Sequence, residues 1–282
     1  MTAPPPESPQ RRHARILGQA VLVLLLAAAG LWFRLQIVES YSAPAGDGLG
    51  YYALSQELLH EGRYAFGPSP MPLSYARTPG YPLFLARIAV RRAPVEIGEH
   101  VARATRWNAG LDVVTATALF AIVRIGGVAG FVPALLAMIG LLCCPMSILL
   151  SCYALSESLA TLLGVASLLM LICVPRTSRR WRLPVTVGAG LCQGAAMLVR
   201  PDMITLLPAA LLSLWWGHSA RHRRMLKMAL FLCAAATIFA PWPVRNWARF
   251  HHPHPTGAEW FTPRDGQILP TGFLRWMETW CA

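Results

Sequence analysis

The chain has 282 residues, of which 55% are hydrophobic and only 13% are charged, and its mean hydropathy is +0.45. Soluble domains carry about 25% charged residues, so this composition excludes a soluble protein and predicts a polytopic membrane protein. The formal net charge of +12 comes from short basic clusters between apolar runs. This is the pattern of loops that face an anionic membrane surface, so we expect membrane lipids, and no nucleic acid, as partners.

The N-terminal residues 1–14 are rich in proline and polar side chains, and Arg11, Arg12 and Arg15 precede the first apolar run. Basic residues beside a span mark its cytoplasmic side. We therefore predict a disordered cytoplasmic tail over 1–14, followed by a first transmembrane helix over 16–37. The apolar run is about 18 residues long, which is the length of a spanning helix rather than that of a cleaved signal peptide.

Residues 38–105 form a long loop that we place on the outer face. Its segment 46–82 is the longest polar and aromatic interruption of the sequence, and its aromatic content argues against disorder. Leucines at helical spacing predict an amphipathic helix over 50–61, and a second short apolar helix is expected over 82–90. We expect the functional site in segment 46–82.

Further spans are predicted over 107–123, 128–144, 153–174, 183–199, 203–216 and 225–242. The connections that this topology places in the cytoplasm are rich in arginine, as the positive-inside rule requires. The fold class is thus an all-α polytopic membrane protein of about seven helices. Its transmembrane domain covers 15–242, and an outer C-terminal segment covers 243–282. Arg200 lies in a very short outer turn, where the charge bias disfavours arginine, so it is a candidate for pairing or ligand contact.

Several short motifs occur in an order that is more specific than any one of them. Asp47 follows the first span, and the later motifs are Arg77-Thr78-Pro79-Gly80-Tyr81-Pro82, Ser156-Glu157-Ser158-Leu159-Ala160, Arg200-Pro201-Asp202 and Pro241-Trp242-Pro243-Val244-Arg245-Asn246. Over about residues 16–250 the sequence resembles the C-type membrane glycosyltransferases. The resemblance is to bacterial relatives of the protein O-mannosyltransferases (glycosyltransferase family 39) and to lipid A aminoarabinose transferases.

The resemblance implies that the protein moves a sugar from a polyprenyl-phosphate donor to an unidentified acceptor on the outer, periplasmic face of a bacterial inner membrane. It also implies that Asp47, the acid of the first outer loop, is the catalytic residue. The sequence departs from the family at Gly48, where many relatives have a second acid. Relatives also continue for further spans, so we expect a truncated chain or a second chain that supplies the missing spans.

The chemistry of the transfer assigns roles to two acids. A carboxylate at the membrane surface can deprotonate an acceptor hydroxyl, which makes Asp47 the predicted general base. The alternative is a turn or helix-capping role for Asp47, because Asp-Gly begins turns and Asp caps helices. Glu157, near the outer start of the fourth span, could assist Asp47 or pair with an outer arginine. Asp112 and Asp202 are weaker candidates.

Arginine suits the donor phosphate, because its planar fork matches phosphate oxygens and stays charged. The candidates are Arg77 and Arg200, followed by Arg34 and Arg245. Contact with lipid headgroups is the alternative role for each arginine. Tyrosine rings could stack on the sugar or belong to an interfacial aromatic belt. The candidates are Tyr51, Tyr52 and Tyr81.

No cofactor and no metal are expected. The seven cysteines form no CxxC pair, and prolines interrupt the C-terminal histidines His251, His252 and His254. Nucleotide-binding and hydrolase motifs are absent from the sequence. The rival function is a non-catalytic membrane protein, either a lipid-linked-sugar transporter or a transferase fragment that binds lipid or a partner. Transporters concentrate polar residues at mid-membrane, whereas here they crowd the outer ends of the spans, which favours the transferase.

Overall fold

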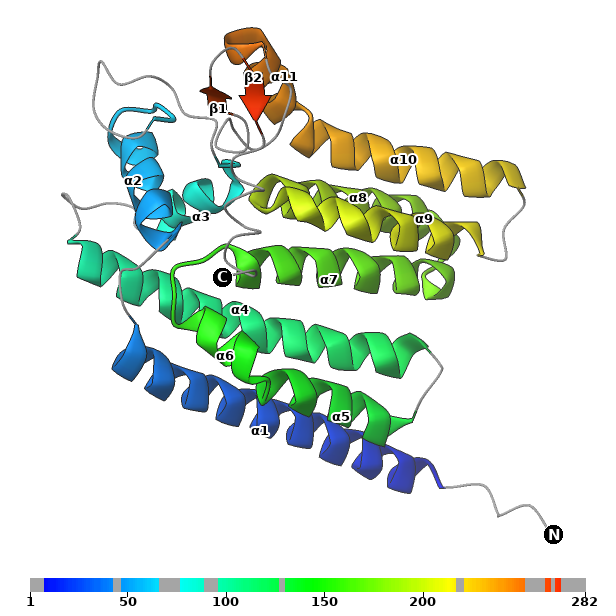
Figure 1. The fold of residues 1–282 in the computed structure, drawn as a ribbon. Coiled ribbons are helices and arrows are strands. Elements are labelled where there is room, and N and C mark those ends of the chain that lie inside the picture. Colours follow the sequence, from blue (N-terminus) through cyan, green and yellow to red (C-terminus); the bar gives the residue numbers. More distant parts are fainter. Residues whose placement is uncertain are drawn as a thin grey trace.

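The computed structural model describes residues 8–42, 47–65, 77–88, 96–126, 130–216, 221–251, 262–264 and 267–269. Long helices run alongside one another, and two shorter helices lie at one end of them (Figure 1). The α-helices are α1 (Pro9–Tyr41), α2 (Asp47–His60), α3 (Gly80–Ile88), α4 (Ile97–Gly126), α5 (Phe131–Leu142), α6 (Pro145–Ser151), α7 (Glu157–Cys173), α8 (Arg182–Val199), α9 (Leu207–Trp215), α10 (Arg221–Phe239) and α11 (Pro241–Phe250). The described elements also include three 3-10 helices, η1 (Val174–Arg176), η2 (Arg179–Trp181) and η3 (Pro201–Leu206). Two antiparallel strands complete them, β1 (Thr262–Arg264) and β2 (Gln267–Leu269).

Within the described residues, four segments are long and apolar enough to cross a membrane: α1, α4, α7 with η1, and η2 with α8. The number rises to six if each of two bent pairs is one span, namely α5 with α6, bent by 49°, and α10 with α11, bent by 45°. The all-α polytopic class is confirmed, but the predicted seven spans become four to six. The predicted sixth span, 203–216, lies in η3 and α9, and the apolar helix Pro201–Trp215 is shorter than a spanning helix.

Helix ends differ from the prediction mainly around the outer loop. α1 begins at Pro9, inside the predicted tail, because proline is favoured in the first turn of a helix. α4 begins at Ile97, so the predicted loop 38–105 contains the ends of two spans. The amphipathic helix predicted over 50–61 begins earlier, at Asp47, because an acid in the first turn interacts favourably with the helix dipole.

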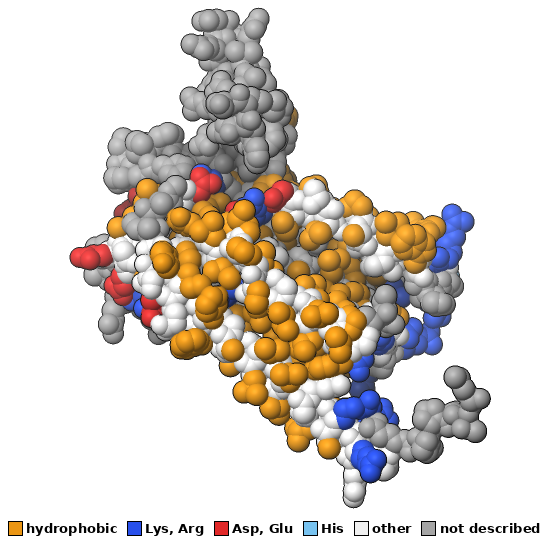
Figure 2. All heavy atoms as spheres, turned by 60° about the horizontal axis from the view of Figure 1, so that its bottom comes forward, with side chains coloured by type: hydrophobic (Ala, Val, Ile, Leu, Met, Phe, Trp, Pro, Cys, Tyr) orange, Lys and Arg blue, Asp and Glu red, His pale blue; other side chains and the backbone are white. Residues whose placement is uncertain are grey.

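The surface of the bundle is divided by polarity. Figure 2 shows hydrophobic side chains over the flank, Lys and Arg at one end, and Asp and Glu toward the other. We call the end that contains the starts of α1, α8 and α10 the basic end, and the end that contains α2 and the start of α7 the acidic end. On the flank, Leu24 and Leu25 of α1 are 68% and 62% exposed. A broad apolar flank between two polar ends fits a protein surrounded by lipid.

α8 and α10 pack at unusually short range. Gly190 and Gly194 of α8 form a small-xxx-small pattern, which lets helices in membranes approach closely. A Cβ atom added at Gly190 would overlap the backbone carbonyl of Phe231, and one added at Gly194 would overlap that of Ala235. Because the obstacle is backbone rather than a flexible side chain, this contact requires glycine at both positions.

The Gly190→Ala variant is expected to be less stable by about 1–3 kcal/mol, because the added methyl group overpacks the α8–α10 contact. Thermal unfolding in detergent measures the change. Gly188→Ala is the matched control, since its Cβ would lie 3.5 Å from the flexible Sδ of Met170. Equal effects of the two substitutions would contradict the assignment of the close contact.

A buried arginine holds the bend between α5 and α6. Arg34 of α1 is fully buried, and it donates hydrogen bonds from Nη1 to the carbonyl of Leu142 at 2.9 Å and from Nη2 to that of Leu141 at 3.1 Å. The last carbonyls of a helix have no intrahelical partner. Arg34 Nη2 also bonds Ser147 Oγ at 3.0 Å, and Ser147 Oγ donates to Asp112 Oδ2 at 3.2 Å. The network joins α1, α4, α5 and α6.

Candidate active site

The acidic end holds an ion pair between α2 and the segment before α3. Arg77 donates two hydrogen bonds to the carboxylate of Asp47, from Nη1 to Oδ2 at 3.0 Å and from Nη2 to Oδ1 at 2.6 Å. This is the fork geometry in which a guanidinium binds a planar carboxylate or a phosphate. The Asp47 side chain is 58% exposed and that of Arg77 is 24% exposed. A ligand can therefore reach both side chains.

Arg77 is held by aromatic neighbours. Its guanidinium lies over the ring of Tyr51, 5.0 Å from the centroid, and the hydroxyl of Tyr64 donates to the carbonyls of Arg77 at 3.0 Å and Thr78 at 3.2 Å. Burial alone would lower the pKa of Arg77, but the hydrogen bond to Asp47 and the nearby negative charge outweigh it and raise the pKa. Arg77 is thus a fixed and permanent cation.

A second charged group surrounds Arg200. Its Nη1 donates to Glu157 Oε1, and its Nε and Nη2 donate to the carboxylate of Asp202 at 3.1–3.3 Å. Burial lowers the pKa of Arg200, whereas the bond to Asp202 and the charge of Glu157 raise it, and the net change is upward. Arg200 and Glu157 are about one-third exposed. The sequence motifs that contain these two residues therefore meet in space.

The same framework carries both groups. Thr78 Oγ1 donates to the carbonyl of Val199 at 3.0 Å, and a Cβ atom at Gly80 would lie only 2.6 Å from the Val199 nitrogen. Val199 directly precedes Arg200. On the other side, the hydroxyls of Tyr51 and Ser156 share a hydrogen bond of 3.2 Å, and Ser156 directly precedes Glu157. Thr78 and Tyr51, the two neighbours of Arg77, are thereby tied to the residues that directly precede both partners of the second ion pair.

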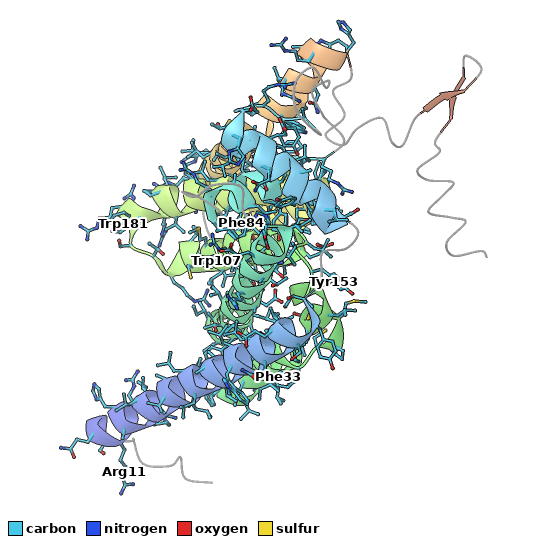
Figure 3. All side chains as sticks on the ribbon, turned by 90° about the vertical axis from the view of Figure 1, so that its left-hand side faces the viewer. Arg11, Phe33, Phe84, Trp107, Tyr153 and Trp181 are labelled. Carbon is cyan, nitrogen blue, oxygen red and sulfur yellow. The ribbon has the colours of Figure 1, made fainter. Side chains whose placement is uncertain are left out.

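The tyrosines predicted to bind sugar are packed against other side chains. Tyr81 is fully buried, and its hydroxyl contacts Asn108. Its ring stacks on Phe84, which meets Trp107 edge to face at 6.3 Å between centroids (Figure 3). Tyr51 is buried under Arg77, while the half-buried Tyr52 faces the ring of His100 at 4.8 Å. In this structure, Tyr81 belongs to the core of the site region rather than to its open side.

The four candidate arginines lie in three environments. Arg77 and Arg200 form the two ion-paired groups just described. Arg34 is in the buried network at the α5–α6 bend, where its guanidinium is engaged by carbonyls. Arg245 of α11 lies over the ring of Tyr64 at 5.8 Å, so it contacts the residue that holds the Arg77 segment. The first two arginines are therefore the ones placed with acids at the acidic end.

Sequence reasoning missed three residues that position the site. Thr78 and Ser156 lie inside the motifs that carry the family resemblance, so their place in those motifs was an available signal. Tyr64 lies in the connection after α2 and has no such signal, because its two acceptors are backbone carbonyls 13 and 14 residues away. Asp202 was a weaker candidate, and the structure places it on Arg200.

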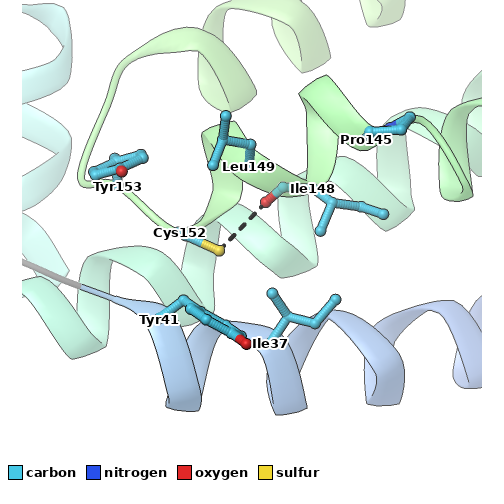
Figure 4. A pocket seen from close by; sticks show the side chains of 7 residues that line it. All are labelled: Ile37, Tyr41, Pro145, Ile148, Leu149, Cys152 and Tyr153. Carbon is cyan, nitrogen blue, oxygen red and sulfur yellow. Dashed lines mark hydrogen bonds between the residues drawn. The ribbon is translucent and has the colours of Figure 1, made fainter.

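A separate apolar pocket of about 400 Å³ lies between the end of α1 and α6 (Figure 4). Its lining residues are Ile37, Tyr41, Pro145, Ile148, Leu149, Cys152 and Tyr153. Neither Asp47 nor Arg77 lines it, so it is distinct from the charged site. In the part of the chain that the structure describes, no three His, Cys, Asp or Glu residues are grouped so that they could hold a metal ion.

No protein-family model and no curated protein matches the sequence. Among solved structures, the chain is similar to the S. cerevisiae protein O-mannosyltransferase Pmt1-Pmt2 complex bound to the sugar donor, with a TM-score of 0.60 and 14% sequence identity. The match covers 87% of this chain and 36% of that chain, so this chain spans little more than a third of the length of the yeast protein. At this identity the similarity establishes the fold. Over the matched region, the chain thus shares the fold of this protein O-mannosyltransferase.

Proposed function

We propose that the protein is a glycosyltransferase of a bacterial inner membrane that moves a sugar from a polyprenyl-phosphate donor to an acceptor hydroxyl. The transfer takes place at the acidic end, which faces outside. The fold shared with a protein O-mannosyltransferase supports the reaction class. The observation that carries the proposal is the Asp47–Arg77 fork, since a group that can take a proton and a group that can bind phosphate are in contact there.

In the proposed reaction, Asp47 accepts the proton of the acceptor hydroxyl while the oxygen of that hydroxyl forms a bond to the anomeric carbon of the sugar. The bond from that carbon to the phosphate oxygen breaks with inversion, and its electron pair leaves on polyprenyl phosphate. Arg77 and Arg200 stabilise the negative charge that develops on the phosphate. The products are the glycosylated acceptor and polyprenyl phosphate, and Asp47 releases its proton to water.

The ion pairs suggest an order of events. A phosphate fits the fork of Arg77 as well as a carboxylate does, so the donor competes with Asp47 for this guanidinium. Donor binding then frees the carboxylate to act as the base. Glu157 is bonded to Arg200 and has the role of orienting that arginine rather than taking the proton itself.

Arg77→Gln is expected to weaken binding of a polyprenyl-phosphate sugar by at least about tenfold, because a hydrogen bond to a charged group contributes about 1.5–3 kcal/mol. Binding of a short-chain polyprenyl phosphomannose to the purified full chain in detergent measures the change. Arg106→Gln is the matched control, since Arg106 is also at the acidic end and pairs with Glu39 at 3.7 Å. If wild type binds neither this donor nor polyprenyl phosphates that carry other sugars, the proposed function is wrong.

Donor binding without transfer would favour the rival function of a lipid-binding transferase fragment or transporter. The share of the yeast chain that is matched, 36%, is the observation behind this alternative. Co-expression with a chain that supplies further spans separates the two cases, because a split enzyme regains transfer and a transporter does not.

A further inference from the structure

The basic end carries many cations and, within the described residues, no acid. Its basic residues are Arg11, Arg12, Arg15, Arg124, Arg176, Arg179, Arg180, Arg182, Arg221, Arg223, Arg224 and Lys227. The Asp and Glu residues that the structure describes lie toward the acidic end or, in the case of Asp112, in the middle of α4. Figure 2 shows the same separation of charge. The described Asp and Glu side chains therefore do not neutralise the basic end.

Three of these cations lie together where α8 and α10 begin. Arg223 and Lys227 are four residues apart on α10 and so share one face of the helix. α8 and α10 lie side by side with Gly190 against Phe231 and Gly194 against Ala235. The same register, continued to the starts of the two helices, brings Arg182 beside Arg223 and one turn from Lys227, and the charges of both arginines act on Lys227. Like charges four residues apart in a helix destabilise it. An anion bound between the two helices would offset this repulsion.

Two donors of the cluster, Arg182 and Arg223, can still bind a ligand. Arg182 donates from Nε to the carbonyl of Thr177 at 3.1 Å and from Nη2 to that of Pro175 at 3.4 Å. These two bonds orient the guanidinium, and they leave its Nη1 group without a partner among the described residues. Arg223 is exposed and makes no hydrogen bond or ion pair to any residue that the structure describes. The site thus combines an anchored donor with a free one.

Tryptophans beside the cluster indicate its depth in the membrane. Trp181 directly precedes Arg182 and is 53% exposed, and Trp216, after α9, is 73% exposed. Arg224 lies over the ring of Trp215 at 5.2 Å and donates to its carbonyl at 2.9 Å. Exposed tryptophans concentrate at the level of lipid headgroups. The cations are therefore at the depth of the headgroup phosphates.

We propose that Arg182, Arg223 and Lys227 form a binding site for the headgroup of an anionic phospholipid. Basic pockets between transmembrane helices bind such headgroups. Because three cations converge, a headgroup with two phosphates fits the site better than a headgroup with one. This inference does not depend on sugar transfer, since the starts of α8 and α10 lie at the end of the molecule opposite to α2, the helix that begins at Asp47 (Figure 1).

The test compares Arg223→Gln/Lys227→Gln with a control that removes the same charge elsewhere on the basic end. Arg182 is left in place because it caps backbone carbonyls. Arg11→Gln/Arg12→Gln is the control, since the start of α1 and the start of α10 lie far apart across this end (Figure 1). Purified full chain is delipidated, and native mass spectrometry then measures binding of added cardiolipin, phosphatidylglycerol and phosphatidylcholine.

Wild type should bind one cardiolipin more tightly than phosphatidylglycerol and should not retain phosphatidylcholine. The α10 variant is expected to bind cardiolipin about 25-fold more weakly, at about fivefold for each lost charge, while the control changes affinity less than about twofold. Arg223→Lys/Lys227→Arg should restore binding. Equal losses in both variants would mean diffuse attraction and overturn the site. Displacement of cardiolipin by an equal concentration of inorganic phosphate would overturn the assignment to a lipid.

Discussion

Asp47→Asn is expected to lower the rate of sugar transfer by about 10²–10⁴-fold, the range that a positioned general base contributes. Asparagine keeps the size of aspartate but cannot accept the acceptor's proton. Donor affinity should be unchanged or higher, because the variant removes the carboxylate that competes with phosphate for Arg77. The initial rate of transfer from a polyprenyl-phosphate sugar and the dissociation constant of the same donor, both in proteoliposomes, measure the two effects.

Glu39→Gln provides the control for Asp47. Glu39 is also an ion-paired acid at the acidic end, but its 3.7 Å contact with Arg106 is about half exposed on both sides. Surface pairs of this kind contribute little, so transfer should remain within about twofold of wild type. Wild-type rates in the Asp47 variant would rule out the general-base role, whatever the control shows.

Arg34→Leu is expected to lower the free energy of unfolding by about 3–5 kcal/mol, the cost of removing one partner from a buried charged network. The substitution leaves the carbonyls of Leu141 and Leu142 without their donor, and it leaves Asp112 without the positive charge of this network. Unfolding by SDS in mixed micelles, followed by circular dichroism, measures the loss.

Two further variants distinguish this network from a general effect on α1. Arg12→Leu removes an exposed arginine from the same helix and should change stability by less than about 0.5 kcal/mol. Removing both charges in Arg34→Leu/Asp112→Leu should recover part of the loss, because an isolated buried charge costs more than none. A double variant with the full sum of both single losses would contradict a shared network.

The existence and approximate bounds of single helices were predictable from the sequence. The predicted span 183–199 corresponds to α8, and the leucine spacing of residues 50–61 predicted most of α2. The number of spans was not predictable, since hydropathy does not show bends. Residues 128–144 are uniformly apolar, yet the described helix ends at Leu142, because Pro145 disfavours a helical conformation at Cys144, which is extended. The position of Arg34 beside that bend depends on the packing of α1.

The sequence named the candidate residues of the site but not which of them are in contact. Asp47 and Arg77 were both candidates, but they are 30 residues apart, and their contact depends on Tyr64 and Thr78 holding the chain. For Tyr81, the sequence did not show which way the side chain faces. A tyrosine in a polar loop has the same sequence signature whether it faces a ligand or the core, and only tertiary packing places it against Asn108.

The close approach of Gly80 to α8 has a consequence for how the sequence can evolve. A Cβ atom there would lie 2.6 Å from the Leu198 carbonyl oxygen and the Val199 nitrogen. Most crowded positions can accept a larger residue when a neighbouring side chain becomes smaller. Here the neighbour is the main chain itself, which no substitution in α8 can shrink. Position 80 therefore has no partner with which it can covary, and drift in the surrounding loop leaves it fixed.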